Sequence, residues 1–137
     1  MNMNEWAREI HENAVNHGWW ESDRELPEIL MLIVSELSEA LEEYRAGRPM
    51  VWYKCMPKDV FNGCINMGNY GEGLVCKKPL CVCADRGKKP EGIAVEVIDA
   101  LIRILDWCGK EGIDVEALVK EKHEYNKIRP YKHGKRC

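Results

Sequence analysis

Two pairs of acidic residues have the same spacing in two strongly apolar segments of the sequence. Glu36 and Glu39 form one pair, and Glu96 and Asp99 form the other. Residues three positions apart lie one turn apart on the same face of a helix, so four carboxylates converge if the two faces meet. Such a cluster must either raise its pKa values or bind cations. Oxygen ligands favour Mg²⁺, with Mn²⁺ as the alternative, and Mg²⁺ commonly binds substrate phosphates at the same time.

These acids have two other interpretations besides a magnesium site. Acidic residues on helices are usually solvated surface charges, and one pair at this spacing is weak evidence for a metal site. The repetition of the spacing favours the metal site. A di-iron carboxylate centre is disfavoured because it needs a Glu-x-x-His motif on two helices, whereas the sequence has Glu39 and Asp99 at those positions.

The elements that must position these acids are four predicted helices, at residues about 3–16, 26–44, about 92–108 and 115–129. Each shows the 3.6-residue apolar period of a helix. Gly18 is expected to end the first helix in a left-handed conformation, and the third should end near Gly109. Asp114 is expected to be the N-cap of the fourth helix, which stops before Pro130.

Residues about 48–91 interrupt the helical pattern and form a predicted insertion in a single domain of residues 1–137. The insertion has no helical period, although short β pairings are compatible with it. It carries five of the seven cysteines, Cys55, Cys64, Cys76, Cys81 and Cys83. A structural zinc site is one interpretation, but only Cys76 and Cys81 have the usual ligand spacing. The alternative is a lobe whose thiols are small packing residues.

The composition limits the classes of partner. The 137 residues include 20 basic and 23 acidic side chains, for a net charge of −3, which argues against a nucleic-acid-binding protein. The first residues do not resemble a signal peptide, and no apolar run approaches the roughly 18 residues that cross a bilayer. We therefore expect a cytoplasmic protein with no membrane or nucleic-acid partner, whose cysteines are mostly thiols or metal ligands.

Basic side chains are available to balance the acids or to bind phosphate. Arg103 lies with Glu96, Asp99 and Asp106 within one arc of about 80° on the third helix. On the fourth helix, an inward apolar face is expected to continue into polar residues. The apolar positions are Val115, Leu118, Val119 and Tyr125, and the polar ones are Lys122, Asn126 and Arg129. These polar groups either hold a polyphosphate or pair with the carboxylates, and spacing alone does not decide.

His17, Trp19 and Trp20 follow the first helix and are the candidates for contact with a nucleobase. Aromatic side chains can stack on bases, and His17 could donate a hydrogen bond to a base or phosphate. The two tryptophans could equally form a hydrophobic plug, because Trp is commonly buried for packing alone. Both interpretations stay open.

Four segments together resemble the MazG-like group of all-α nucleoside triphosphate pyrophosphohydrolases, relatives of dimeric dUTPases and phosphoribosyl-ATP pyrophosphohydrolases. They are "HGWW", "SELSEALEEYR", "EGIAVEVIDALIRILDW" and "KHEYNKIRPYKHG". The resemblance covers the helices, about two-thirds of the chain, and implies an all-α, four-helix MazG-like bundle. The Cys-rich irregular insertion makes the spacer between the acidic pairs longer than in the family. Ser35 stands where many relatives have a Glu, a role that Glu42 or Glu43 could take.

The resemblance also implies an activity, the Mg²⁺-dependent hydrolysis of a nucleoside triphosphate to the monophosphate and pyrophosphate, which controls the nucleotide pool. The implied metal-binding and catalytic residues are Glu36, Glu39, Glu96 and Asp99, and the implied substrate-binding residues are His17, Trp19, Trp20, Arg103, Lys122, Asn126 and Arg129. The family and the apolar third helix both predict a homodimer or homotetramer. The competing class is a non-catalytic helical module for binding or regulation, with a Cys-rich zinc lobe.

Overall fold

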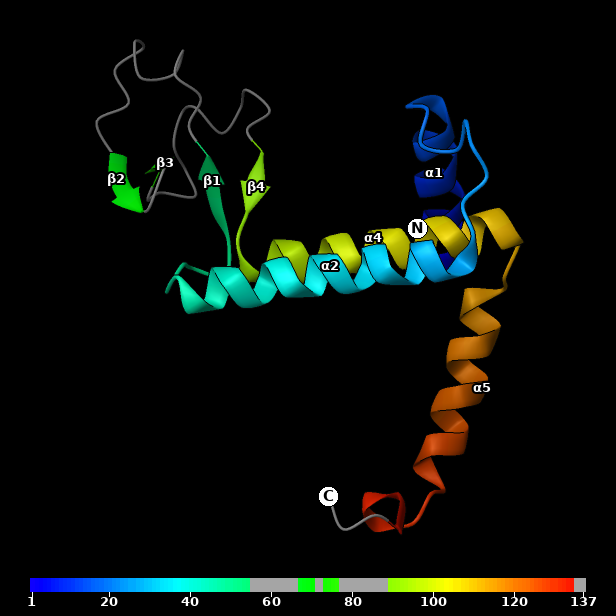
Figure 1. The fold of residues 1–137 in the computed structure, drawn as a ribbon. Coiled ribbons are helices and arrows are strands. Elements are labelled where there is room, and N and C mark those ends of the chain that lie inside the picture. The colour runs from blue at the N-terminus through cyan, green and yellow to red at the C-terminus, as the bar shows by residue number, and fades with distance from the viewer. Residues whose placement is uncertain (55–66, 71–72, 77–88, 135–137) are drawn as a thin grey trace. The chain divides into compact units, whose positions relative to one another are not determined.

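The computed structural model describes residues 1–54, 67–70, 73–76 and 89–134 (Figure 1). These described residues contain four α-helices, which confirms the predicted all-α fold with a cysteine-containing segment between the second and third helices. The helices are α1 (Met3–Asn16), α2 (Leu26–Arg45), α4 (Ile93–Glu111) and α5 (Val115–Lys127), followed by a short 3₁₀ helix, η2 (Tyr131–Gly134). In the part of the chain that is described, no helix is both long and apolar enough to span a membrane.

The chain divides into two compact units. One unit contains Met1–Glu25 and Ile102–Cys137, and the other contains Leu26–Leu101. The helix α4 contributes its first half to the second unit and its last half to the first. The prediction of a single domain stays a prediction.

The start and end of α1 follow from local sequence signals. The side chain of Asn2 accepts a hydrogen bond from the amide of Glu5 at 2.9 Å, and the carboxylate of Glu5 accepts one from the amide of Asn2 at 2.8 Å. This reciprocal pair is a capping box, which satisfies two amides that the helix leaves unpaired. At the other end, Gly18 has a φ of +81°, which confirms the left-handed position predicted after the helix.

The N-termini of α1 and α5 cap each other. The side-chain oxygen of Asn4 accepts hydrogen bonds from the amides of Val115, at 2.8 Å, and Glu116, at 3.2 Å. In return, the carboxylate of Glu116 accepts from the amide of Met3 at 2.8 Å. Asp114 accepts from the amide of Ala117 at 3.0 Å, as predicted for an N-cap. These bonds join the two helix ends, because each would otherwise leave backbone amides unpaired.

The core of the first unit requires close contact between α1 and α4. Ala7, Leu105 and Cys108 are its buried residues, and the partly buried residues around them are Ile10, Trp107, Ile113 and Val115. A Cβ atom on Gly109 would lie 2.3 Å from the carbonyl oxygen of Ala7. The helix α4 ends at Glu111, near the predicted end at Gly109, and the left-handed Gly112 follows it with a φ of +65°. Gly109 itself serves helix packing.

The described part of the insertion contains a small antiparallel sheet, in the strand order β2-β3-β1-β4. The strands are β1 (Trp52–Lys54), β2 (Met67–Tyr70), β3 (Gly73–Cys76) and β4 (Pro90–Glu91). Trp52 pairs with Glu91 and Tyr53 pairs with Cys76. The short β pairings with which the sequence is compatible are therefore present in the described part of the insertion, whereas Cys81 and Cys83 lie outside the described residues.

The first turn of α4 is attached to the segment that follows α2. The amide of Ala94 donates a hydrogen bond to the carbonyl oxygen of Met50 at 2.9 Å. Between the strand β4 and the helix, Gly92 has a φ of +117°, and a Cβ there would lie 2.6 Å from the same carbonyl oxygen. A side chain would be excluded at this position by both strain and contact. The first turn of α4, which leads to Glu96, is thus held by backbone contacts.

The apolar face of α5 differs from the prediction. Val115 packs against the core of its unit, but Leu118, Val119 and Tyr125 are 54%, 48% and 55% exposed. The helix contains no buried residue. The expectation that this whole face points inward was wrong for a single chain, because the contacts that α5 makes to its own unit are at its N-terminal end.

Candidate metal centre

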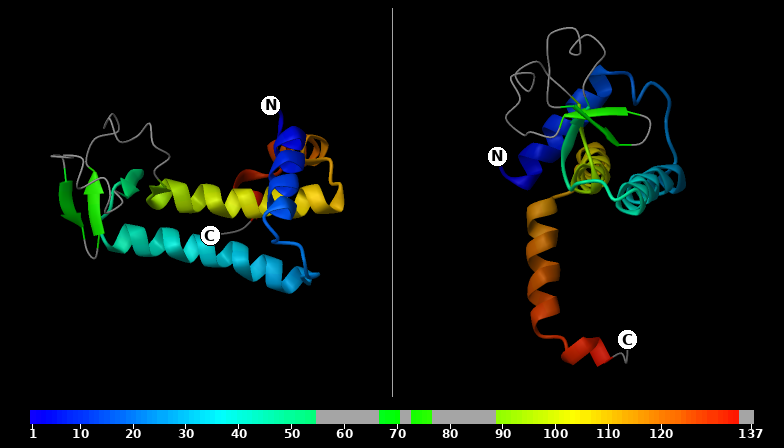
Figure 2. Two further views of the ribbon diagram at one scale, coloured as in Figure 1. Left: turned by 90° about the horizontal axis from the view of Figure 1, so that it is seen from above. Right: turned by 90° about the vertical axis from the view of Figure 1, so that its left-hand side faces the viewer.

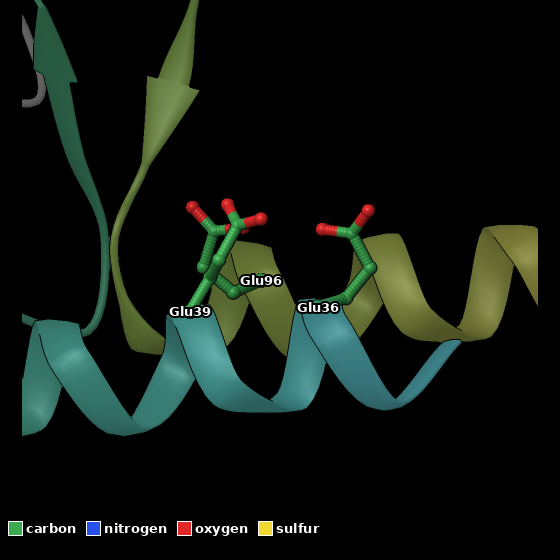
Figure 3. Close-up of side chains that lie close together, drawn as sticks. All are labelled: Glu36, Glu39 and Glu96. Carbon is green, nitrogen blue, oxygen red and sulfur yellow. The ribbon is translucent and has the colours of Figure 1, made fainter. Parts of the chain in front are cut away.

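Three carboxylates from two helices meet in the second unit (Figure 3). One oxygen each from Glu36, Glu39 and Glu96 can be chosen so that all lie within 4.8 Å of one another. The side chains point to the same side of α2 and the first half of α4, which run side by side (Figures 1 and 2). Glu36 and Glu96 are only 8% and 6% exposed, whereas Glu39 is exposed. The meeting of the two acidic faces, which spacing predicted, is therefore present in the structure.

The same local pattern positions the buried acid on each helix. Ala40 follows Glu36 by four residues, Ala100 follows Glu96 by four residues, and all four side chains are buried. Residues four apart lie on one face of a helix, so an acid and an alanine form the buried face of each helix in this region. The buried carboxylates therefore share this face with the smallest apolar side chain that a helix commonly carries.

The crowding of these acids changes the protonation of Glu96. Its pKa is raised from 4.5 to about 7, first because burial disfavours the charged form and then because Glu39, Asp99, Glu91 and Glu36 add negative charge. A buried carboxylate near other carboxylates either stays protonated or acquires a cation. Three oxygen donors at this separation fit a hard divalent cation such as Mg²⁺ or Mn²⁺.

Asp99, the fourth predicted ligand, does not belong to the group of three oxygens within 4.8 Å. It lies one turn after Glu96 on α4, is partly buried, and its charge contributes to the raised pKa of Glu96. The structure therefore brings three of the four predicted ligands together and places the fourth near enough to act on them electrostatically.

The two acids proposed as substitutes for a glutamate at position 35 are already paired. Glu42 accepts a hydrogen bond from Arg45 at 2.7 Å. Glu43 accepts one from Arg48 at 2.9 Å and one from the indole of Trp52 at 2.8 Å. Both carboxylates therefore have cationic partners, and Glu43 attaches the base of the insertion to α2.

Sequence reasoning missed Lys89 and Glu91, which adjoin the metal centre. The ammonium of Lys89 lies 2.9 Å from the carboxylate of Glu91, whose side chain is 14% exposed. The negative charge of Glu91 acts on Glu96. Both residues were assigned to the insertion, and only their closeness in sequence to Glu96 could have indicated a role.

Trp20 is anchored within the first unit by hydrogen bonds. Its indole N–H lies 3.0 and 3.1 Å from the two carboxylate oxygens of Asp106, and one of those oxygens also lies 2.7 Å from Nδ1 of His11. The ammonium of Lys110 lies over the Trp20 ring, 4.8 Å from its centroid. The partly buried Trp20 therefore has a structural role in fixing the segment after α1.

Trp19 differs from its neighbour because it is 55% exposed. The guanidinium of Arg24 lies over its ring, 5.5 Å from the centroid. His17 is also exposed, and its Nδ1 lies 2.8 Å from the carbonyl oxygen of Asn13. When Nδ1 carries a hydrogen, it can donate a hydrogen bond to this oxygen at the end of α1. Of the three residues predicted to contact a base, Trp19 thus offers the exposed ring that stacking requires.

The predicted phosphate-binding side chains belong to the first unit. Lys122 and Asn126 line an open hollow of about 360 Å³ on α5, together with Leu118, Val119 and His123. Lys122 and Arg129 also lie near the ring of Tyr125, at 5.1 and 6.0 Å from its centroid. Arg103 is partly buried on α4 and has an interaction partner. That these residues act on the same ligand as the carboxylates stays a prediction, because the carboxylates belong to the other unit.

Comparisons of the chain with protein-family models, curated proteins and solved structures found no match. The family resemblance therefore stays a prediction based on the two segments with the acidic pairs and on the two other segments.

Proposed function

We propose that this protein is a metal-dependent nucleoside triphosphate pyrophosphohydrolase of the MazG-like type. The reaction forms one P–O bond from water, breaks one P–O bond and releases a nucleoside monophosphate and pyrophosphate. The observation that carries the proposal is the set of three carboxylate oxygens within 4.8 Å of one another, two of them on buried side chains.

The chemistry of the three acids supports this proposal. Glu36, Glu39 and Glu96 would hold the metal, with Asp99 adding negative charge from the next turn of α4. A bound divalent cation would supply a water of lowered pKa and neutralise charge on the phosphate oxygens. Burial of two of the three acids excludes water from one side of the site, which strengthens electrostatic attraction between the acids and a cation. Acidic residues that only increase solubility are normally exposed to solvent and not buried.

The other predicted residues supply substrate contacts under this proposal. Lys122, Asn126 and Arg129 would hold phosphate oxygens, since Arg binds them in a bidentate manner and Lys as a point charge. Trp19 would stack on the base, because its ring is exposed. Surplus or non-standard nucleotides are the expected substrate class.

The test is the release of pyrophosphate from a panel of canonical and modified nucleoside triphosphates, with Mg²⁺ and with Mn²⁺. Glu39→Gln and Asp99→Asn should each lower turnover by about a hundredfold or more while the far-ultraviolet circular dichroism spectrum stays unchanged. Glu42→Gln is the matched control on α2, because Glu42 is paired with Arg45 on the exposed surface. Turnover of either acid variant near the wild-type value would contradict the four-carboxylate site.

The alternative is a non-catalytic module for binding or regulation, with a structural Zn²⁺ in the insertion. The five cysteines of the insertion favour this alternative, although most of them lie outside the described residues. Binding of Mn²⁺ without turnover of any nucleotide in the panel would support it.

We also propose that the chain assembles as a homodimer or homotetramer. Apolar side chains on three helices are about half exposed in the single chain, among them Leu30, Val34 and Leu37 on α2, Ile98 and Leu101 on α4, and Leu118 and Val119 on α5. Exposed apolar surface of this extent is typical of a face that another subunit covers. A 13-residue helix such as α5 is also marginal in water without packing on an apolar face.

A further inference from the structure

Lys89 places a positive charge beside the acidic cluster. Its ammonium lies 2.9 Å from the carboxylate of Glu91 and is attracted electrostatically by Glu96 and Asp99. The pKa of Lys89 is raised, first by its hydrogen bond to Glu91 and then by these negative charges, which outweigh the opposite effect of burial. Lys89 therefore carries its charge throughout the neutral pH range.

The backbone near Lys89 is fixed, whereas its side chain is exposed. Pro90 pairs with Tyr53 in the sheet, and Gly92 lies against the carbonyl oxygen of Met50. The side chain of Lys89 is 72% exposed, and within the described part of the chain its ammonium contacts Glu91. An ammonium has three N–H donors, and the bond to Glu91 uses one, so others can reach a ligand.

The charge balance around Lys89 depends on whether a cation occupies the cluster. In its absence, Glu96 and Asp99 attract the ammonium. Once their charge is neutralised by a divalent cation, Glu91 remains as the carboxylate that holds Lys89. An anionic group brought to the cation would then be attracted by the positive charge of Lys89, which has N–H donors left to bind it. Lys is a common ligand of phosphate, as a point charge on a flexible stem.

We propose that Lys89 binds a phosphate group of the triphosphate substrate and that Glu91 positions it for this contact. The inference rests on the proposed function, because it needs a polyphosphate bound at the metal centre. It adds to that function a substrate-binding residue on the base of the insertion, which no motif of the sequence indicated.

The test separates phosphate binding from turnover. Calorimetry with inorganic tripolyphosphate and saturating Mn²⁺ measures polyphosphate binding, and electron paramagnetic resonance measures the binding of Mn²⁺ alone. The variants are Lys89→Met, Lys89→Arg and Glu91→Gln. Lys127→Met is the matched control, because Lys127 also pairs with a glutamate, at 2.6 Å from Glu124, but belongs to the unit that does not contain Glu36, Glu39 and Glu96.

The loss of one charged hydrogen bond should weaken tripolyphosphate binding by about tenfold in Lys89→Met. Lys89→Arg should keep most of the affinity, and Glu91→Gln should lose part of it. The binding of Mn²⁺ alone should be unchanged or tighter in Lys89→Met, because a repelling charge is removed. Lys127→Met should match the wild type in both measurements.

Three outcomes would overturn the proposal. Tripolyphosphate affinity unchanged in Lys89→Met would show that Lys89 is only a counter-charge. An equal weakening of Mn²⁺ binding and tripolyphosphate binding would show an indirect, structural effect. A wild-type protein that does not bind tripolyphosphate would overturn both this proposal and the proposed function. Binding of tripolyphosphate without release of pyrophosphate from nucleotides would overturn the proposed function alone. The tripolyphosphate affinities of the wild type and Lys89→Met would still show whether Lys89 binds phosphate.

Discussion

The replacement of Glu96 by Gln should stabilise the metal-free protein at pH 8 and change its stability little at pH 4.5. Glu96 is 6% exposed, and its pKa is raised to about 7 by burial and by the neighbouring acids. The folded state therefore keeps a proton that the unfolded state has already released. Because the folded state binds more protons between pH 4.5 and pH 7, stability falls as the pH rises through this window.

The size of the effect follows from the two pKa values. One pH unit between them corresponds to about 1.4 kcal/mol, so a rise from 4.5 to about 7 makes the ionised Glu96 cost about 3 kcal/mol above pH 7. The cost is absent below pH 4.5, where the carboxyl is protonated in both states. In a chain of 137 residues, about 3 kcal/mol corresponds to roughly 10 °C in the melting temperature.

The assay is thermal unfolding of the wild type and Glu96→Gln with a chelator, at pH 4.5 and pH 8. The difference in melting temperature between the two proteins is measured at each pH. The value at pH 8 minus the value at pH 4.5 gives the effect of the titration of Glu96. Glu12→Gln is the control, because Glu12 is an exposed residue of α1. Mg²⁺ should stabilise the wild type at pH 8 more than at pH 4.5, because protons compete with the cation for the carboxylates.

The same difference in melting temperature between Glu96→Gln and the wild type at both pH values would refute the reasoning. It would show that burial and the neighbouring acids do not destabilise the ionised form of Glu96. A destabilisation by Glu96→Gln at pH 8 in the metal-free state would refute the reasoning as well. Equal stabilisation of both proteins by Mg²⁺ would show that the cation binds without Glu96.

Three further predictions concern packing, assembly and the insertion. Gly109→Ala should lower the free energy of unfolding in urea by about 1–3 kcal/mol, because the new Cβ would meet the carbonyl oxygen of Ala7; an unchanged midpoint would contradict the close approach of α1 and α4. Light scattering at micromolar concentration should give a dimer or tetramer, and Leu118→Asp should shift the mass toward one chain; a fully active monomeric wild type would contradict assembly. Elemental analysis of protein purified without chelator should give about one zinc per chain if the insertion holds a thiolate site, with loss on Cys76→Ser, whereas zinc-free protein would leave the thiols as packing residues.

Helical periodicity was sufficient to predict the four helices, and capping signals placed several of their ends. Asp114 is the predicted N-cap of α5, and Gly18 is the predicted left-handed residue after α1. The packing role of Gly109 could not be predicted, because the sequence does not distinguish a glycine that ends a helix from one that allows another helix to approach. The distinction depends on Ala7, which is far from Gly109 in sequence.

The convergence of Glu36, Glu39 and Glu96 could be predicted, because both acidic pairs have the period of a helix and both helices are apolar around them. The paired state of Glu43 and the role of Lys89 could not be predicted. Arg48 and Lys89 lie outside helices and strands, and Trp52 and Glu91 lie in strands of three and two residues, which are too short to give a periodic signal in the sequence. The exposure of the apolar face of α5 could not be predicted either. An apolar face on a helix indicates that it is buried, but not whether the same chain or another subunit covers it.

The hydrogen bond between Ala94 and Met50 means that the insertion begins and ends at nearly the same point in space. A segment whose two ends meet adds little constraint to the chain on either side of it, and the entropic cost of lengthening such a loop grows only slowly. The part of the insertion between Lys54 and Lys89 is therefore modular, whereas Trp52 is bonded to α2 and Lys89 and Glu91 adjoin the metal centre. This part can gain, lose or exchange sequence during evolution while α2 and α4 keep the register that brings Glu36 and Glu96 together, so a new specificity could be acquired there without rebuilding the metal centre.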